Sequence, residues 1–272
     1  MSRIAEVLKE KRAHKAKALI PYLVAGDPDL QTTVRLMHAL VSAGADIIEL
    51  GIPFSDPSSD GTIIQLGAER ALAGGTRLLD VLAVVSQFRQ QDTATPVVLM
   101  GYLNPIEAMG YQQFALNASQ AGVDGVLVVD MPVNESADFF AAVKPFGLDT
   151  VFLVAPTTSD ARLLTICQAC SGYLYYVSLK GVTGAAIRDK GEIRIRIEQL
   201  RGITDLPVVV GFGIKDSRSA QEMASVSDGI IVGSALVERI AQLSGKQGIS
   251  ESDITSSTEL IAVLRKSIDN IK

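Results

Sequence analysis

The sequence predicts an α/β protein in which residues 1–272 form a single domain, a (β/α)8 TIM barrel with an extra N-terminal helix and additional helices after the eighth strand. Three observations predict this fold. Apolar strand-like runs recur eight times, helical patterns lie between them, and no long linker or change of composition divides the chain. Barrels of this class commonly need about 250 residues. A doubly wound open sheet is the alternative, but eight regular units in 272 residues leave little room for a second domain.

Most of the eight strand-like runs carry apolar residues on both faces. This pattern is typical of parallel strands that are covered by helices on one side and by a packed interior on the other. Turn-forming Gly, Pro, Asn and Asp residues mark where the strands end. In chain order the predicted strands are residues 19–24, 46–50, 97–100, 125–129, 150–154, 174–177, 208–210 and 229–232.

Segments with helical periodicity separate the predicted strands. They cover residues 32–42, 78–90, 107–120, 136–143, 160–169, 192–200 and 217–225. The first ten residues have a short amphipathic pattern, which predicts the extra N-terminal helix. After the eighth strand, residues 235–243 and 259–271 predict two more helices, and the polar stretch 244–257 between them predicts a mobile surface loop.

Composition argues against several kinds of partner. The net charge is −5, the pI is near 5.2 and no patch is rich in Lys and Arg, so we expect neither nucleic acid nor a membrane as a partner. No apolar run approaches the roughly 18 residues of a membrane span, and the N-terminus lacks the apolar core of a signal peptide. Two cysteines in 272 residues indicate a reducing compartment, so we expect a cytoplasmic protein.

Glycines follow the last three predicted strands, at the end of the barrel where sites of this fold class lie. Gly184 follows the sixth strand, Gly213 the seventh, and Gly233 and Ser234 the eighth, where a helix begins. Glycine allows backbone amides to approach a ligand, and a helix N-terminus favours an anion. Such glycines can also serve only to make tight turns, but their position after these strands favours a phosphate-binding site.

Two acids lie in or soon after the second predicted strand. Glu49 interrupts an apolar run, where burying a charged carboxylate is costly unless something compensates it. Asp60 follows in a loop rich in Pro, Ser and Asp. Glu49 could be a salt-bridged structural acid, and Asp60 could cap the helix that starts near Ile63. Because the predicted phosphate site lies at the same end of the barrel, we favour a catalytic role for these acids, with the stronger case for Glu49.

Apolar and aromatic residues at or near the strand ends are ordinary core candidates, but together they could line a slot for a flat ring beside the phosphate. They are Tyr22, Met100, Tyr102, Leu127, Val129, Leu153, Tyr175, Phe212 and Val232.

The sequence predicts no metal site. Cys167 and Cys170 form half of a zinc or redox motif late in a helical segment, without a second pair, so we interpret them as packing residues. His14 and His38 lie in helical patterns away from the strand ends. Lys180 lies in a loop at the predicted site and could contact phosphate or form a Schiff base, although such a lysine is more often solvated.

Several motifs, taken together, resemble those of the tryptophan synthase alpha subunit family. The segment 49–61, Glu-Leu-Gly-Ile-Pro-Phe-Ser-Asp-Pro-Ser-Ser-Asp-Gly, is similar to the signature of that family. Segments 21–28, 101–105, 156–158, 181–184 and 210–214 also resemble its motifs, and the resemblance runs from about residue 4 to residue 264. Three positions depart from the family pattern, since Ser59 and Thr62 stand for Ala and Pro and Tyr22 stands for Phe. These departures bear on loop mobility and ring packing, and both acids are retained.

The resemblance implies a lyase of tryptophan biosynthesis, which cleaves indole-3-glycerol phosphate to indole and D-glyceraldehyde 3-phosphate in a retro-aldol reaction. It implies that Glu49 protonates the indole ring and then accepts a proton from the side-chain hydroxyl, while Asp60 stabilises the ring N–H. It further implies a phosphate site at Gly184, Gly213, Gly233 and Ser234, a ring site against Phe212, Leu127 and Tyr175 with Tyr22, Met100, Tyr102 and Leu153 nearby, and a hydrogen bond from Thr183 to Asp60.

The resemblance also implies that this chain needs no metal or organic cofactor. Pyridoxal phosphate would belong to a partner β subunit, which would join this chain in an α2β2 heterotetramer. Two other functions stay open. Another phosphosugar isomerase or epimerase would need other acids or a metal-binding His set, and a scaffold that only docks to a β subunit would not need both Glu49 and Asp60.

Overall fold

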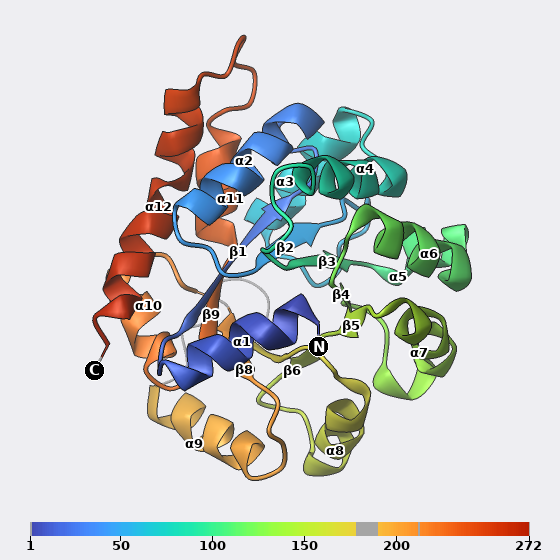
Figure 1. The fold of residues 1–272 in the computed structure, drawn as a ribbon, viewed down its shortest axis with the longest axis vertical. Coiled ribbons are helices and arrows are strands. Elements are labelled where there is room, and N and C mark those ends of the chain that lie inside the picture. The colour runs from blue at the N-terminus through green and yellow to red at the C-terminus, as the bar shows by residue number, and fades with distance from the viewer. Residues whose placement is uncertain (1, 178–189, 212, 272) are drawn as a thin grey trace.

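The computed structural model describes residues 2–177, 190–211 and 213–271, and within them nine parallel strands form one sheet (Figure 1). The strand order β5-β4-β3-β2-β1-β9-β8-β7-β6 curves around a packed interior, with helices outside, so the predicted TIM barrel is confirmed. The strands are β1 (Ala18–Val24), β2 (Ile48–Gly51), β3 (Val97–Gly101), β4 (Gly125–Val128), β5 (Asp149–Thr150), β6 (Phe152–Val154), β7 (Leu174–Val177), β8 (Val208–Gly211) and β9 (Gly229–Val232).

The fifth predicted strand, residues 150–154, is divided into two short strands. β5 pairs with β4, whereas β6 pairs with β7. Between them the Val151 N–H donates to the Val126 carbonyl at 3.0 Å, which keeps the chain in contact with β4. The two halves thus face different neighbours at the place where the barrel closes, and this is why eight predicted strands become nine.

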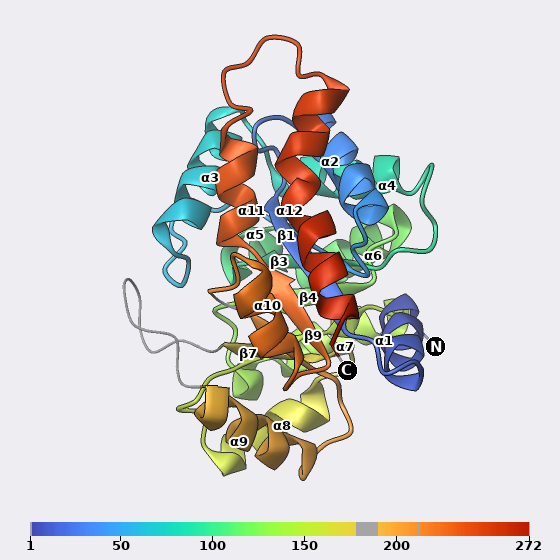
Figure 2. The same cartoon turned by 90° about the vertical axis from the view of Figure 1, so that its left-hand side faces the viewer.

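Helices pack around the outside of the sheet (Figures 1 and 2). They are α1 (Arg3–Ala13), α2 (Leu30–Ser42), α3 (Thr62–Ala73), α4 (Leu78–Phe88), α5 (Leu103–Met109), α6 (Tyr111–Ala121), α7 (Ala137–Val143), α8 (Asp160–Ala169), α9 (Lys190–Arg201), α10 (Ser217–Ala224), α11 (Ser234–Ala241) and α12 (Glu251–Asp269), with the 3-10 turns η1 (Val133–Glu135) and η2 (Lys144–Phe146). The extra N-terminal helix and the additional helices after the last strand are therefore present.

Two helix predictions differ most from the structure. The single helix predicted at residues 107–120 is two helices, α5 and α6, because Gly110 between them has φ +84°, in the left-handed region that glycine tolerates. α12 begins at Glu251, since the Ser250 side chain caps its first turn by accepting the Asp253 N–H. The loop predicted at residues 244–257 is therefore shorter than expected, and its second half is helical.

Side chains of the strands alternate between the barrel interior and the layer under the helices. In β1, Ile20 and Tyr22 belong to an inner cluster, whereas Leu19 and Leu23 pack with the outer cluster. In β2, Leu50 belongs to the outer cluster, so the side chain of its neighbour Glu49 points into the barrel. The inner cluster also contains Val98, Leu127, Val151, Tyr173, Tyr175, Val209 and Ile231.

α1 covers the end of the barrel where the strands begin (Figure 1). Its Ile4 and Leu8 are buried in the inner cluster. Ile4 lies so close to β4 that a Cβ added to Gly125 would come within 2.9 Å of Ile4 Cδ1. This end of the interior is therefore filled by protein side chains, and the strand C-termini are left for a ligand.

Three aspartates at the same end fix the register of neighbouring strands. Asp46, Asp124 and Asp228 each precede a strand, and each accepts a backbone N–H from the start of the strand that comes before it along the chain. The donors are Leu19, Val97 and Val208, at 2.8, 2.8 and 2.9 Å. A one-residue slip would break these bonds and would also turn every core side chain to the wrong face.

In the described part of the chain, no single helix is long and apolar enough to cross a membrane. α3 and α4 reach that length and composition only as a pair, and they are bent by 95° at their junction.

Candidate active site

The C-terminal ends of the strands surround a cavity of about 310 Å³, here named the rim cavity. Its walls come from the ends of β1, β3, β7 and β9, from the segment that leads into α3, from the loop after β8 and from the first turn of α11. The predicted site residues that line it are Tyr22, Asp60, Met100, Tyr175, Gly213, Gly233 and Ser234.

Glu49 lies beside this cavity, inside the barrel. It is directly opposite the cavity residue Tyr22 in the pairing of β1 with β2, and its side chain is fully buried. The Tyr173 hydroxyl donates a hydrogen bond to Glu49 Oε1 at 2.5 Å, whereas Oε2 has no hydrogen-bond partner among the described residues. Glu49 is therefore a buried carboxyl group held at one oxygen, and among the described residues it has no basic partner that would make it a structural ion pair.

The surroundings of Glu49 change its protonation. Burial raises its pKa from 4.5 to about 7, because an apolar interior disfavours the charged form, and the hydrogen bond from Tyr173 lowers the pKa by a smaller amount. Near neutral pH both the acid and the base form are then populated. Such a group can donate a proton in one step and accept one in the next.

Asp60 does not cap α3, so that interpretation of the sequence was wrong. The N-cap of α3 is Gly61, with no side-chain capping bond. The Asp60 carboxyl lines the rim cavity, and burial raises its pKa to about 6, while a hydrogen bond with Tyr102 lowers it by a smaller amount. At neutral pH Asp60 is therefore mostly ionised and can stabilise positive charge on a ligand in the cavity.

Tyr102 holds the segment that carries Asp60. Its hydroxyl accepts the Ser59 N–H at 3.0 Å, and its ring stacks on Phe54 at 5.4 Å between centroids. The Gln65 side chain adds a third contact, since its Nε2 donates to the Asp60 carbonyl at 2.8 Å. Tyr102 thus supports the segment that carries Asp60, and it does not itself line the cavity.

Two glycines at strand ends make room for the tyrosines of the cavity. A Cβ at Gly51 would lie 2.3 Å from the Tyr22 hydroxyl oxygen, and a Cβ at Gly211 would lie 2.3 Å from that of Tyr175. Any larger residue at either position would displace a ring. In the sequence these glycines indicate only the end of a strand, so their role in packing was not predicted.

The first turn of α11 provides a place for an anion. Gly233 is the N-cap, without a side-chain capping bond, and Ser234 begins the helix. The first amides of a helix have no intrahelical acceptor, and they carry the positive end of the helix dipole. Gly213, at φ +76°, lines the same part of the cavity. These groups match the chemistry predicted for a phosphate site.

The other predicted residues are placed differently. Leu127 is fully buried in the inner cluster and does not line the cavity, and Leu153 lines a separate cavity near α8. Thr183, Gly184 and Phe212 lie outside the described residues. The sequence interpretation missed several residues of the wall, which are Ser59, Gly61, Ile63, Ile64, Ile214, Lys215, Ile231, Ala235 and Glu238.

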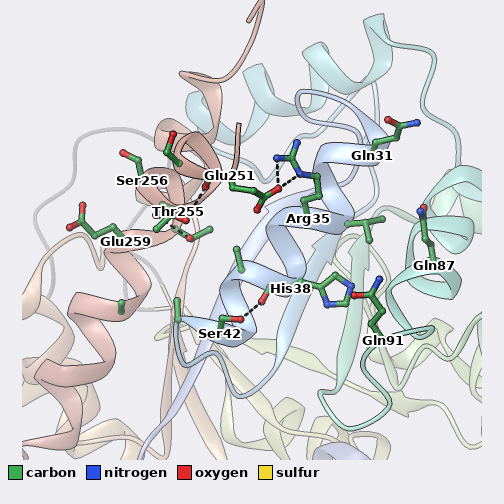
Figure 3. Close-up of a pocket in the computed structure, with 16 residues that line it drawn as sticks. Gln31, Arg35, His38, Ser42, Gln87, Gln91, Glu251, Thr255, Ser256 and Glu259 are labelled. Atoms are coloured by element: carbon green, nitrogen blue, oxygen red, sulfur yellow. Dashed lines mark hydrogen bonds and ion pairs between the residues drawn. The ribbon is translucent and has the colours of Figure 1, made fainter. Parts of the chain in front are cut away.

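A larger cavity of about 1160 Å³ lies outside the barrel, between α2, α12 and the end of α4 (Figure 3). Its arginine, Arg35, is neutralised by Glu251 at 2.6 Å, and the His38 ring lies tilted against the Phe88 ring at 4.8 Å between centroids. Figure 3 shows the remaining polar side chains spread along the helices without converging on one point. The rim cavity, with Asp60 on its wall, Glu49 beside it and a helix N-terminus, is therefore the better candidate for an active site.

The two cysteines pack in or against the outer cluster, as the sequence predicts. Cys167 and Cys170 are free thiols, and burial raises the pKa of Cys170 to about 12, which keeps it protonated and unreactive. Among the residues that the structure describes, no group of three or more His, Cys, Asp or Glu side chains could hold a metal ion.

Comparison with known proteins finds relatives over nearly the whole chain. A family model described as "Tryptophan synthase alpha chain" matches residues 8–266. Proteins of that name from Nitrosococcus oceani and Acinetobacter baumannii are each 52% identical, over 269 and 264 residues, and the alignments cover 99% and 97% of this chain and 98% of each relative. The crystal structure of tryptophan synthase subunit alpha from Legionella pneumophila has a TM-score of 0.90 and 44% identity, over the full length of both chains.

Proposed function

The chain belongs to the tryptophan synthase alpha chain family, the lyases that cleave indole-3-glycerol phosphate to indole and glyceraldehyde 3-phosphate, and we propose that Glu49 and Asp60 carry out this cleavage here. The observation that supports the proposal best is Glu49, a fully buried acid beside the rim cavity with a pKa of about 7. The reaction needs a group that donates and then accepts a proton, and Glu49 is suited to both tasks.

In the first step, protonated Glu49 donates its proton to C3 of the indole ring. The ring loses its aromatic character and becomes an iminium cation, with positive charge on the ring nitrogen. Asp60, ionised above a pH of about 6, lies on the wall of the same cavity and stabilises this charge through the ring N–H.

In the second step, the Glu49 carboxylate accepts the proton of the hydroxyl group on the carbon attached to C3. The bond between that carbon and C3 breaks, its electron pair returns to the ring, and the carbon becomes the aldehyde of glyceraldehyde 3-phosphate. Indole leaves as a neutral aromatic molecule, and Glu49 is again protonated. The reaction needs no oxidant or reductant. Glu49 gives up one proton in the first step and takes up one proton in the second.

The phosphate of the substrate binds at Gly213, Gly233 and Ser234, with Gly184 completing the site. Binding energy from this remote group orients the ring against Tyr22, Met100 and Tyr175, so that C3 approaches Glu49. The support is the cavity itself, which joins the helix N-terminus and these side chains in about 310 Å³.

Family members need no cofactor for this half of the reaction. Pyridoxal phosphate resides in a β subunit, which takes up the indole, and this chain assembles with that subunit in an α2β2 complex. The whole chain forms one domain, because the helices before and after the barrel pack into the same cores as its strands. It acts in the cytoplasm, where its two free thiols stay reduced.

The direct test is to mix the purified chain with indole-3-glycerol phosphate and to follow the release of indole. Glu49→Gln keeps the size of the side chain but cannot transfer the proton, so we expect kcat to fall about 10²–10⁴-fold with little change in substrate affinity. Glu259→Gln, a substitution on the exposed face of α12, is the matched control and should leave turnover unchanged. Near-parental turnover of Glu49→Gln would remove Glu49 from the mechanism.

A further inference from the structure

Lys215 lies in the loop between β8 and α10, next to the proposed phosphate site. It is an exposed residue that lines the rim cavity together with Gly213, Gly233 and Ser234. Among the residues that the structure describes, it is the one lysine or arginine on the wall of this cavity. The other proposed phosphate ligands are backbone amides and a hydroxyl, which carry no formal charge. Lys215 can therefore supply the full positive charge that they lack.

The backbone of Lys215 is fixed, whereas its side chain is free. Its N–H donates to Ser219 Oγ at 3.1 Å, and Ser219 forms a capping box with Asp216 at the start of α10. The ammonium group makes no ion pair with any residue in the described part of the chain. Its charge helps to lower the pKa of the neighbouring Asp216, but both groups are exposed, so little is lost when the ammonium group turns toward an anion in the cavity.

Glu238 places a negative charge on the same wall. It lies one turn into α11 from Ser234 and lines the rim cavity, so its carboxylate repels a bound phosphate. Lys215, Ala235 and Glu238 also line a neighbouring cavity of about 520 Å³. Both charged side chains thus lie where two cavities meet and remain hydrated, which keeps the effect of each charge moderate.

We propose that Lys215 is a specificity-determining residue that selects the phosphorylated substrate by its charge, and that Glu238 opposes it and limits how tightly the phosphorylated product is held. A phosphate monoester carries nearly two negative charges at neutral pH, so one nearby cation favours it over an uncharged analogue. This inference rests on the proposed function, because it concerns the charge at the phosphate end of the same site.

The test compares Lys215→Met, Lys215→Arg, Glu238→Gln and the parent protein. For Lys215→Met we expect the KM for indole-3-glycerol phosphate and the Ki of glycerol 3-phosphate to rise about 3- to 10-fold, with kcat within about twofold of the parent. Lys215→Arg should retain most of the affinity, and Glu238→Gln should lower the Ki. Lys215→Met should also weaken the dependence of KM on salt concentration, because a screened charge has been removed.

The matched control is Lys266→Met, which removes an exposed lysine in the last turn of α12, far from the cavity. It should leave KM, Ki and kcat unchanged. An equal Ki for the parent and Lys215→Met, or a fall in kcat at constant KM, would overturn the inference while the proposed function stands. If glycerol 3-phosphate failed to inhibit even the parent, the phosphate site itself would be misplaced, and both proposals would fail.

Discussion

Glu49, beside the rim cavity, and Asp60, on its wall, are two neighbouring carboxyl groups with different protonation states. Glu49 is fully buried and has a pKa of about 7, whereas Asp60, which is partly exposed, has a pKa of about 6. Burial is the main cause of both shifts, so the difference follows from how far each group lies from solvent. At a pH between the two values, Asp60 is mainly ionised while Glu49 is still mainly protonated. This is the combination that the first step of the reaction needs.

These pKa values predict a bell-shaped pH dependence. Activity should rise as Asp60 loses its proton near pH 6 and fall as Glu49 loses its proton near pH 7, so kcat/KM should be highest between these values. The measurement is kcat/KM for indole-3-glycerol phosphate from pH 5 to pH 9. Asp60→Asn is the control for the loss of activity at acidic pH. If this loss persists in the variant, it comes from protonation of the substrate phosphate instead.

The raised pKa of Glu49 also predicts that this buried acid reduces stability at high pH. The unfolded chain releases this proton near pH 4.5, whereas the folded protein holds it until about pH 7, so stability is lost as pH rises through this range. The cost above pH 7 is at most about 3 kcal/mol. Glu49→Gln has no titratable group at this position. Its free energy of unfolding should therefore increase relative to that of the parent when the pH is raised from 5 to 8. Urea denaturation at both pH values measures this, and a constant difference would contradict the pKa.

At the residue scale, the sequence indicates both acids as candidates, but not the residues that contact them. Glu49 was predictable because a carboxyl group inside an apolar strand is unusual. Its partner Tyr173 lies 124 positions away in the sequence, and no local pattern connects them. Lys215 and Glu238 were missed because exposed charged residues are common, and only the folded chain places these two on the wall of one cavity.

At the scale of elements, three aspartates connect the strands to their surroundings. Asp124 is nearly fully buried, and it accepts the Val97 N–H while pairing with Arg3 of α1 and with Arg89 after α4, both at 2.7 Å. One carboxylate therefore links two strands and two helices. The sequence predicts the strands by their periodicity, but not these links, because each partner comes from a different part of the chain.

Removing Asp124 should therefore be costly. Asp124→Ala leaves two arginines and a strand N–H without their partner, and we expect the free energy of unfolding to fall by about 3–5 kcal/mol. Asp124→Asn can still accept the N–H and should lose less. Asp160→Ala is the control, because its carboxylate also pairs with an arginine, Arg196, but is 78% exposed, so we expect a loss of at most about 1 kcal/mol. Equal losses in urea denaturation would show that burial of the pair is unimportant.

At the scale of the whole molecule, the barrel was predictable because eight apolar runs alternate with helices along one chain. The division of the fifth strand was not, since it depends on which neighbour each half meets when the barrel closes. The same holds for the segment before α3. Its position comes from the contacts of Tyr102 with Phe54 and Ser59, which bring together residues more than 40 positions apart.

We expect a β subunit to accelerate the cleavage by favouring one conformation of the segment before α3. Phe54 and Ser59 are tied to Tyr102, but Ser55, Asp56 and Ser58 between them are exposed and bury little apolar surface. Few buried contacts allow such a segment to sample several conformations, so Asp60 at its end faces the ring for only part of the time. A partner that contacts Asp56 and its neighbours would favour the productive conformation without adding a catalytic group.

A conformation populated at about 10% in the free chain and at nearly 100% in the complex would make the reaction about tenfold faster. The measurement is the rate of indole release at increasing concentrations of a β subunit whose own chemistry is disabled, since indole would otherwise be consumed. Asp56→Ala serves as the matched variant, because it should weaken the acceleration while leaving the rate of the isolated chain nearly unchanged. Rates that stay equal at every concentration of the partner would show that the isolated chain already holds Asp60 in place.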